Sequence, residues 1–407
     1  MRSTQQKHFV FIRRMPQTIV WGGLEKLFLD WLERIDYKAC RVTLAVTQGG
    51  KALFEQKFKE KNLPIQIVEF SVDFRRNSVH QFCEMYWCLR PLKPSTVIFV
   101  QGAFTDFYLG VVLAGFLLTR NNVYMHENLG APSPAEKSSK YHWGVIPGMG
   151  LWWHKEKLLN KLRGMFSRRI FVVSQEIQEQ LIKRWGYPRH KVVVSYHGID
   201  LEKFSFSLSK RQHIRKLLKI PRSDFVFMIS ARLAIEKRID RAIEAFDRLT
   251  EERDHVWLLI LGEGNLKQDL EHFAQQKKSG NKIQFLGYKD NVGEYLNAAD
   301  CYVSSSDTEG LSIALLEAMA AGITCVATDC TGSTELIQRS QSGFLVVKST
   351  ECVFQGMRKA AFLSPEEKKE ITSRGTQFIA KHFEYERQIA DILIAMQIPN
   401  IAVEDSR

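Results

Sequence analysis

Two carboxylates in the C-terminal half of the chain have a spacing that suits sugar binding. Glu309 precedes an apolar helical pattern that ends at Gly322, and Glu317 lies inside that pattern. A helix starting at residues 310–312 points free backbone N–H groups toward a phosphate, and Gly310 lets a ligand approach the backbone. The carboxylates can accept hydrogen bonds from sugar hydroxyls. The alternative is that Glu309 is solvated and Glu317 only complements the helix dipole.

Two cations are predicted at the same edge of the sheet. Arg232 and Lys237 follow the apolar run Phe225–Ile229, which has the pattern of a buried strand. Their charge could neutralise a diphosphate and stabilise the negative charge that builds on it as a sugar leaves. Alternatively, they pair with Glu236 and Asp240 as ordinary charges at the start of a helix.

Glycines follow two further strands in the same half. Gly262 and Gly264 come after one strand, and Gly287 follows Leu286 at the end of another. Such glycines indicate backbone that lines a cleft, although α/β turns also use glycine for other reasons.

Short β-branched or aromatic runs alternate with amphipathic helical stretches along the whole chain, which predicts parallel βαβ units. The predicted strands are Phe9–Ile12, Val42–Val46, Ile65–Val68, Val97–Val100, Val123–Met125, Ile170–Val173, Val192–Val194, Phe225–Ser230, Val256–Leu261, Ile283–Leu286, Cys301–Ser304, Thr324–Ala327 and Phe344–Val347. The fold class is therefore α/β, with two doubly wound parallel-sheet, Rossmann-like domains. We expect one domain over residues 1–200 and a second domain, which carries the carboxylates and cations described above, over 201–375. A helical segment, 376–407, is expected to pack back on the first domain, and the linker is expected near 196–208.

Charge is distributed unevenly. Residues 1–200 hold 29 lysines and arginines against 16 acidic residues, a net charge of +13, and the remainder has a net charge of −1. A positive charge of this kind can attract nucleic acid, an anionic membrane or a phosphorylated substrate. Alternatively, the surface is basic and has no such partner. The tryptophans Trp143, Trp152 and Trp153 stand among lysines in the stretch 141–161. This stretch could bind the acceptor or a membrane.

Composition excludes several other classes. The seven cysteines are scattered without a CxxC pair, so we expect buried thiols and neither a disulfide framework nor a zinc site. The longest apolar run, Leu109–Leu118, is too short to cross a bilayer and predicts a buried helix. The N-terminus lacks the apolar stretch of a signal peptide, so a cytoplasmic location is expected.

The second half of the chain resembles family 4 of the glycosyltransferases. The matching motifs are Arg232-x4-Lys237, the Gly-Glu-Gly turn at 262–264, Phe-Leu-Gly-Tyr at 285–288, the Glu309-x7-Glu317 pair and the segment 328–335. The junction region His197-Gly198-Ile199-Asp200 also resembles the family, although the family commonly has Asn where His197 stands. The resemblance implies the GT-B fold, with two domains that face a central cleft, and a reaction that retains anomeric configuration without a metal or other cofactor.

Carried over to this sequence, the resemblance assigns a role to each matching residue. It places Glu309 on the donor-sugar hydroxyls, Glu317 on the ribose, and Arg232 with Lys237 on the diphosphate. The backbone at Gly310 and Leu311 would face the donor, and the region of Gly287 would face the base.

The resemblance implies that residues 201–375 are the nucleotide-sugar-binding domain and residues 1–200 the acceptor-binding domain. The first half matches the family less closely, as expected for an acceptor-binding domain. Gly22 and Gly23 resemble the glycine pair that lies near the donor phosphates, although they could form a plain N-terminal turn. His126, after the strand Val123–Met125, resembles the histidine that family members place near the reacting sugar. A neutral imidazole there could orient a hydroxyl or the developing charge, but a lone histidine is also a common packing residue.

These residues predict transfer of a hexose-type sugar from a nucleotide-diphosphate donor, with a UDP-sugar favoured, to an acceptor hydroxyl. The expected acceptor is a glycan or lipid-linked glycan of lipopolysaccharide, O-antigen or capsule synthesis, with possible contact to the inner face of the cytoplasmic membrane. The rival functions are a sugar-nucleotide epimerase of the same fold and a non-catalytic nucleotide-sugar-binding protein. A nucleic-acid binder would explain only the charge.

Overall fold

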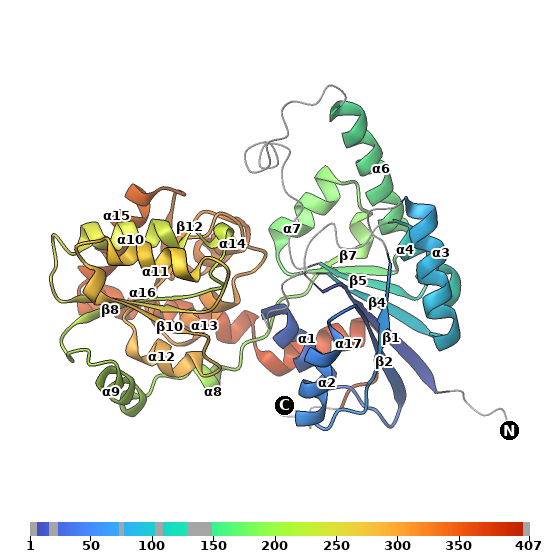
Figure 1. The fold of residues 1–407 in the computed structure, drawn as a ribbon, viewed down its shortest axis with the longest axis horizontal. Coiled ribbons are helices and arrows are strands. Elements are labelled where there is room, and N and C mark those ends of the chain that lie inside the picture. Colours follow the sequence, from blue (N-terminus) through green and yellow to red (C-terminus); the bar gives the residue numbers. More distant parts are fainter. Residues whose placement is uncertain (1–5, 16–22, 73–76, 102–108, 128–148, 402–407) are drawn as a thin grey trace. The chain divides into compact units, whose positions relative to one another are not determined.

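The computed structural model describes residues 6–15, 23–72, 77–101, 109–127 and 149–401. The chain divides into two compact units (Figure 1). Unit 1 comprises Met1–Tyr196 and Gln388–Arg407, and unit 2 comprises His197–Arg387.

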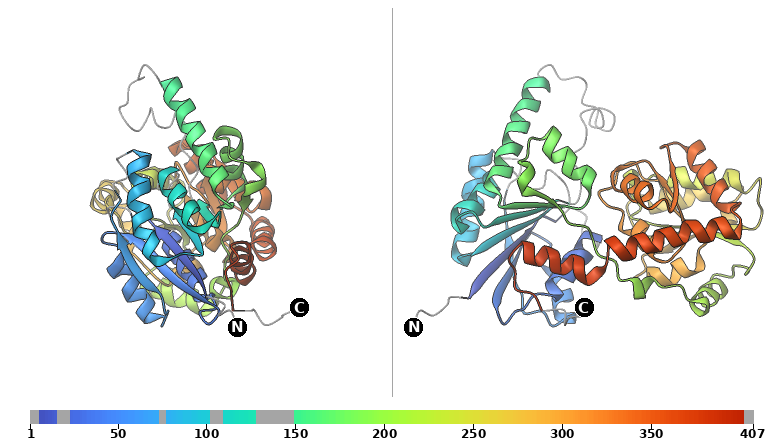
Figure 2. Two further views of the ribbon diagram at one scale, coloured as in Figure 1. Left: turned by 90° about the vertical axis from the view of Figure 1, so that its right-hand side faces the viewer. Right: turned by 180° about the vertical axis from the view of Figure 1, so that it is seen from behind.

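Unit 1 contains a parallel sheet of seven strands in the order β3-β2-β1-β4-β5-β6-β7. The strands are β1 (Lys7–Arg13), β2 (Cys40–Thr47), β3 (Gln66–Phe70), β4 (Thr96–Gln101), β5 (Val123–Glu127), β6 (Arg169–Val172) and β7 (Val192–Val194). Its helices are α1 (Gly23–Glu33), α2 (Lys51–Glu60), α3 (Ser78–Leu89), α4 (Leu109–Thr119), α6 (Met149–Phe166), α7 (Gln175–Glu179) and most of α17 (Tyr385–Ala395). Helices α1 and α2 cover one face of the sheet, and α3, α4 and α6 cover the other (Figures 1 and 2). Because both faces are covered, central strands such as β1 and β4 are buried along almost their full length, and each has four apolar residues in a row.

Unit 2 contains a parallel sheet of six strands in the order β10-β9-β8-β11-β12-β13. The strands are β8 (Phe225–Ser230), β9 (Val256–Leu261), β10 (Ile283–Gly287), β11 (Cys301–Ser304), β12 (Thr324–Thr328) and β13 (Gly343–Val346). The helices are α8 (Leu201–Phe204), α9 (Leu208–Leu217), α10 (Ile239–Leu249), α11 (Lys267–Gln275), α12 (Val292–Ala298), α13 (Ile313–Ala320), α14 (Thr331–Ser340), α15 (Thr350–Ala361) and α16 (Pro365–His382). Its core is a continuous cluster of buried apolar side chains from the strands and from α10, α11 and α15.

The structure confirms all thirteen predicted strands, each within a few residues of its predicted ends. The apolar run Leu109–Leu118 forms the predicted helix, α4, and seven of its residues are buried. Gly322 has a φ of +69° just after the last residue of α13, which confirms its predicted place beyond the helix end. Within the described part of the chain, no helix combines the length and apolar character needed to cross a bilayer.

Two expectations need correction. The C-terminal helical stretch is two helices, because the backbone at Phe383 and Glu384 leaves the helix to pair with Ile199, whose N–H donates to the Phe383 carbonyl at 2.7 Å. Buried thiols are found at four of the seven cysteines, but Cys83 is exposed.

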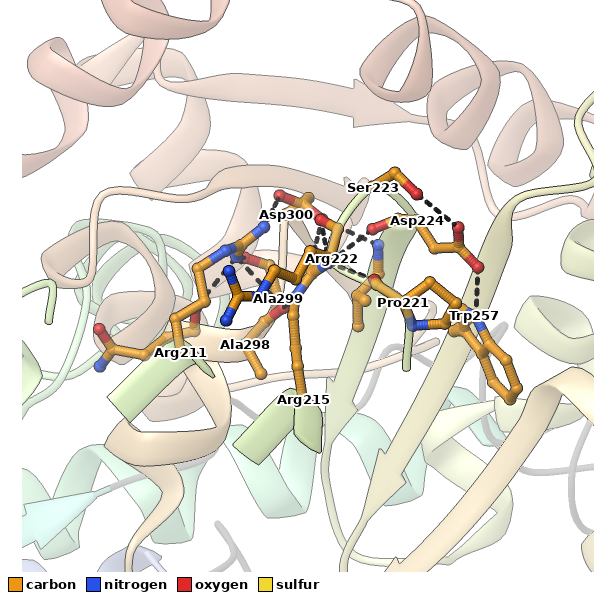
Figure 3. A network of polar contacts seen from close by, with 12 residues as sticks. Arg211, Arg215, Pro221, Arg222, Ser223, Asp224, Trp257, Ala298, Ala299 and Asp300 are labelled. Atoms are coloured by element: carbon orange, nitrogen blue, oxygen red, sulfur yellow. Dashed lines mark hydrogen bonds and ion pairs between the residues drawn. The ribbon is translucent and has the colours of Figure 1, made fainter. Parts of the chain in front are cut away.

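A buried carboxylate, Asp300, ties α9 to the start of β8 and β11 (Figure 3). It accepts hydrogen bonds from Arg211 and Arg215 at 2.7 Å each and from the Val226 N–H at 2.9 Å. Burial alone would raise the pKa of Asp300, but Arg211, Lys368 and Arg215 outweigh this effect and lower it. The network lies at the amino ends of the strands, so it supports unit 2 from the edge opposite the predicted site.

Candidate donor site in unit 2

The predicted donor-binding residues gather where the strand order of unit 2 reverses. The strands β8 and β11 are neighbours in the sheet. After β8 the chain continues to β9 and β10 on one side, and after β11 it continues to β12 and β13 on the other side. In open α/β sheets, ligands bind beyond the carboxyl ends of the strands at such a switch point. The loop after β8 carries Arg232 and Lys237, and the loop after β11 carries Glu309 and Gly310. The two predicted sets of residues therefore lie in neighbouring loops at the same edge of the sheet.

Lys237 and Glu309 join the two loops directly. The Lys237 ammonium donates to both carboxylate oxygens of Glu309 at 2.7 Å, and both side chains are less than one-fifth exposed. The Ser306 hydroxyl also donates to Glu309, at 2.7 Å. The structure thus brings this cation and this carboxylate together, and their charges neutralise each other.

The loop after β11 is fixed by contacts to the loop after β8. The Asp307 N–H donates to the Glu236 carbonyl at 2.8 Å, and the Ser305 hydroxyl donates to the Lys237 and Arg238 carbonyls at 3.0 and 2.8 Å. Arg241 bonds the carboxylate of Asp307 at 3.0 Å. These contacts position Glu309 before any ligand arrives. Sequence reasoning missed Arg241, whose location on α10 offers no local signal.

Arg232 lies in the predicted loop but points elsewhere. Its side chain is about half exposed and forms an ion pair of 2.5 Å with Glu236, four residues later. The alternative pairing with a nearby acid is therefore what the structure shows for Arg232. Asp240 pairs with Arg238 and not with Lys237.

Glycines at this edge allow loops to approach each other closely. A Cβ atom at Gly262 would lie 1.9 Å from the Ala231 carbonyl oxygen, and one at Gly264 would lie 2.2 Å from the Leu233 carbonyl oxygen. At Gly332 it would lie 2.3 Å from the Gly310 carbonyl oxygen. Gly332 is the second residue of α14, inside the motif segment 328–335, but the sequence alone did not single it out. It holds the start of α14 against the backbone predicted to face the donor.

Glu317 and the end of β10 form the next part of the site. Glu317 is buried on α13, and Leu311 is buried just before that helix. Gly287 ends β10 with a φ of +70°, which favours glycine. After it, Tyr288 is half exposed, and burial, a hydrogen bond to Asp290 and the negative charge of Glu317 raise its pKa to about 12. A neutral phenol ring thus lies within the electrostatic reach of Glu317.

The predicted residues of unit 1 are placed less completely. Gly22 lies outside the described residues, as does Trp143, and Gly23 is the first residue of α1. His126 ends up fully buried on β5, with its ring edge-on to Trp31 at 4.8 Å between centroids. The side chains of Trp152 and Trp153 on α6 are also outside the described part.

Charged side chains that the sequence did not flag surround this edge of the unit 1 sheet. Arg13, at the end of β1, forms a buried 2.8 Å ion pair with Glu25 in the first turn of α1. Arg163 of α6 lies 3.7 Å from the carboxylate of Glu127 and donates to the Gln101 side chain at 3.3 Å. The carboxyl ends of β1, β4 and β5 are therefore polar and buried. In the described residues, no group of three or more His, Cys, Asp and Glu could hold a metal ion.

Comparison with known proteins gives a consistent result for both units. The family model "Glycosyltransferase Family 4" matches residues 21–203, and "Glycosyl transferases group 1" matches residues 210–377. An Escherichia coli UDP-Gal:α-D-GlcNAc-diphosphoundecaprenol α-1,3-galactosyltransferase is 30% identical over 184 residues, which is 44% of this chain and 47% of the relative. A putative colanic acid biosynthesis glycosyltransferase of E. coli K12, WcaL, is 29% identical over 53% of this chain and 54% of its own length. The matches thus span about half the length of these curated relatives.

Solved structures match over almost the whole chain. HepE of Anabaena, solved with UDP and glucose, has a TM-score of 0.74 at 18% identity, covering 96% of this chain and 99% of HepE. WaaG, a glycosyltransferase of lipopolysaccharide biosynthesis, has a TM-score of 0.69 at 16% identity and covers 95% and 99% of the two chains. The two-sheet fold is therefore that of these glycosyltransferases.

Proposed function

The chain belongs to glycosyltransferase family 4, and from that premise we propose that it transfers a hexose from a UDP-sugar to an acceptor hydroxyl with retention of anomeric configuration. The observation that supports this proposal most directly is the contact of Lys237 with Glu309 across the switch point of unit 2. Two similar proteins support UDP as the nucleotide, because HepE was solved with UDP and the E. coli galactosyltransferase is named for UDP-galactose.

In the proposed complex, the donor replaces the present partners of these side chains. The diphosphate attracts Lys237 and Arg232, which leave Glu309 and Glu236. Glu309 is then available to the sugar hydroxyls, and Glu317 to the ribose. The N–H groups at Gly310 and Leu311 and at the start of α13 add partial positive charge beside the phosphate.

The chemistry follows from this distribution of charge. As the bond from the anomeric carbon to the diphosphate oxygen lengthens, negative charge grows on the leaving group, and the two cations and the N–H groups stabilise it. The acceptor hydroxyl attacks on the same face and gives its proton to the departing phosphate. Because Lys237 and Arg232 supply the positive charge, the proposed reaction uses no metal, and excess EDTA should leave the rate unchanged.

We further infer that the acceptor is a glycan or lipid-linked glycan of envelope polysaccharide synthesis. The similarity to WcaL, to WaaG and to the galactosyltransferase named for a diphosphoundecaprenol acceptor supports this acceptor class. The basic character of residues 1–200 supports a location in the cytoplasm at the inner face of the cytoplasmic membrane. If the wild-type protein does not pellet with anionic vesicles at low salt, the membrane part of this proposal is wrong.

A thermal-shift panel of UDP-, GDP- and ADP-sugars tests the donor. A ligand at about a hundred times its Kd stabilises the folded state by about 2.7 kcal/mol, which corresponds to a rise of about 5–10 °C for a unit of this size. The proposal expects this rise with UDP-sugars alone, and a panel without any shift would refute it. Donor isomerisation in the absence of acceptor, followed by NMR, would instead identify an epimerase.

A further inference from the structure

Unit 1 carries an unusual pairing of exposed apolar and cationic side chains on three neighbouring helices. Helix α4 packs against α3 on one side and against α6 on the other, where Phe116 meets Phe166 at 5.0 Å between ring centroids (Figures 1 and 2). On each helix, an apolar side chain that is at least half exposed is followed three residues later by an exposed cation. The pairs are Trp87 and Arg90, Leu117 and Arg120, Leu158 and Lys161, and Met165 and Arg168.

The spacing places each set on one side of its helix. Residues three and four apart share a helical face, so Leu158, Lys161 and Met165 form one stripe along α6, which Arg168 continues beyond the helix end. On α3, the exposed Val79 and Cys83 extend the stripe of Trp87 by two turns. We call the outward surface formed by the four pairs the α3–α4–α6 face.

The cations of this face differ from comparable cations of unit 2 in whether a carboxylate pairs with them. There, Leu208 and Ile235 are also exposed and also precede an arginine by three residues. Those arginines are engaged by carboxylates: Arg211 lies 2.7 Å from Asp300, and Arg238 lies 2.9 Å from an oxygen of Asp240.

The four cations of the α3–α4–α6 face have no carboxylate partner among the residues that the structure describes. Arg90 lies over the ring of its own neighbour Trp87, at 5.1 Å from the centroid, and Arg168 donates to the side-chain oxygen of Asn122. Arginines near helix C-termini are ordinarily explained by the helix dipole. That explanation does not cover Lys161, which lies inside α6, or the exposed apolar side chains.

We propose that the α3–α4–α6 face docks on an anionic lipid bilayer. Apolar side chains entering the headgroup boundary beside cations that meet lipid phosphates are the arrangement of helices that lie in a membrane interface, and tryptophan is enriched there. The phosphates supply the counter-charge that the described residues lack. This inference rests on the proposed membrane attachment and assigns it to a surface. It is independent of the donor site, which lies in unit 2.

The test uses the full chain and vesicles of phosphatidylcholine mixed equally with phosphatidylglycerol, with pure phosphatidylcholine as the comparison. The charge variant is Arg90→Gln, Arg120→Gln and Lys161→Gln combined. Because each cation near an anionic leaflet contributes about a fivefold effect, vesicle binding should weaken about a hundredfold. The matched control, Lys216→Gln, Lys219→Gln and Arg222→Gln in unit 2, removes the same charge from exposed positions and should bind as the wild type does.

A second pair of variants tests the apolar part. Trp87→Ser with Leu117→Ser should also lose vesicle binding, whereas Leu217→Ser with Phe362→Ser, which changes equally exposed residues of unit 2, should not. The proposal is overturned if the face variants bind like the wild type, or if the controls lose as much. It is also overturned if the apolar variant changes only the oligomeric state, since the face would then be an interface between copies. Thermal shift by UDP without vesicles should be the same for all variants, so a failed donor site is recognised separately.

Discussion

Replacing Glu309 with glutamine should change donor binding and sugar transfer in opposite directions. In the unliganded protein the carboxylate holds the Lys237 ammonium through two contacts of 2.7 Å. The pair is only partly shielded from water, so we assign it about 1 kcal/mol. UDP, which lacks the transferred hexose, must draw Lys237 away from this carboxylate. Without the negative charge, UDP should therefore bind about fivefold more tightly.

Transfer should fall in the same variant. A hydrogen bond to a charged group contributes about 1.5–3 kcal/mol, so losing the carboxylate's bonds to the sugar hydroxyls should lower kcat/KM by about 10- to 150-fold. Titration calorimetry with UDP and initial rates with the UDP-sugar measure the two effects. Glu244→Gln on α10 is the charge-matched control, because Glu244 is half exposed and faces Lys277. If UDP affinity falls together with the rate, Glu309 positions Lys237 for the diphosphate and does not compete with the diphosphate for Lys237. That result would show that the reasoning is wrong.

Three further predictions concern the supports of the site and of unit 2. Gly332→Ala puts a Cβ atom 2.3 Å from the Gly310 carbonyl oxygen, so transfer should fall about a hundredfold while the circular dichroism spectrum stays the same; a normal rate would show that this contact does not position the donor loop. Asp300→Asn leaves buried arginines without their counter-charge, so urea denaturation should show a loss of about 3 kcal/mol in unfolding free energy, and an unchanged midpoint would contradict the role of the network. Burial lowers the pKa of His197 from 6.5 to about 4, so the folded state favours the neutral ring. As the pH falls from 6.5 toward 4 the unfolded state takes up the proton first, and unfolding free energy should drop by about 1.4 kcal/mol per pH unit. His197→Asn should remove that dependence in melting curves, and an identical pH profile in the variant would refute the assignment.

The fold was largely predictable because it depends on local patterns. Strands buried on both faces, such as Val256–Leu261, must be apolar throughout, and this makes them visible in the sequence. The location of Arg232, Lys237 and Glu309 was predictable for a related reason: loops that follow parallel strands reach the same edge of the sheet.

The partners of these side chains were not predictable from the sequence. Lys237 and Glu309 are 72 residues apart, and whether a lysine pairs with a carboxylate in its own loop or in another loop depends on the packing of the two strands. Arg232 pairs with Glu236 in its own loop, whereas Lys237 pairs with Glu309 in another loop. The contact of Gly332 with Gly310 is equally non-local, because only the assembled loops show why a side chain cannot fit there.

In unit 1 the sequence showed the charge but not where it acts. The excess of positive charge is a property of the composition, whereas the Arg13–Glu25 and Arg163–Glu127 pairs bury four charged side chains that a sequence would place on the surface. Trp87, beside Arg90, shows the opposite case: a sequence would place its apolar ring in the core, but the ring is exposed.

Hydrogen–deuterium exchange with and without saturating UDP tests the central claim, that the donor binds at the switch point of the unit 2 sheet. We predict slower exchange in peptides that cover residues 231–238 and 305–312, which contain Lys237 and Glu309, and little change at the opposite edge around Asp300. If UDP raises the melting temperature while both of these loops exchange as fast as in its absence, the donor binds elsewhere and the account is contradicted.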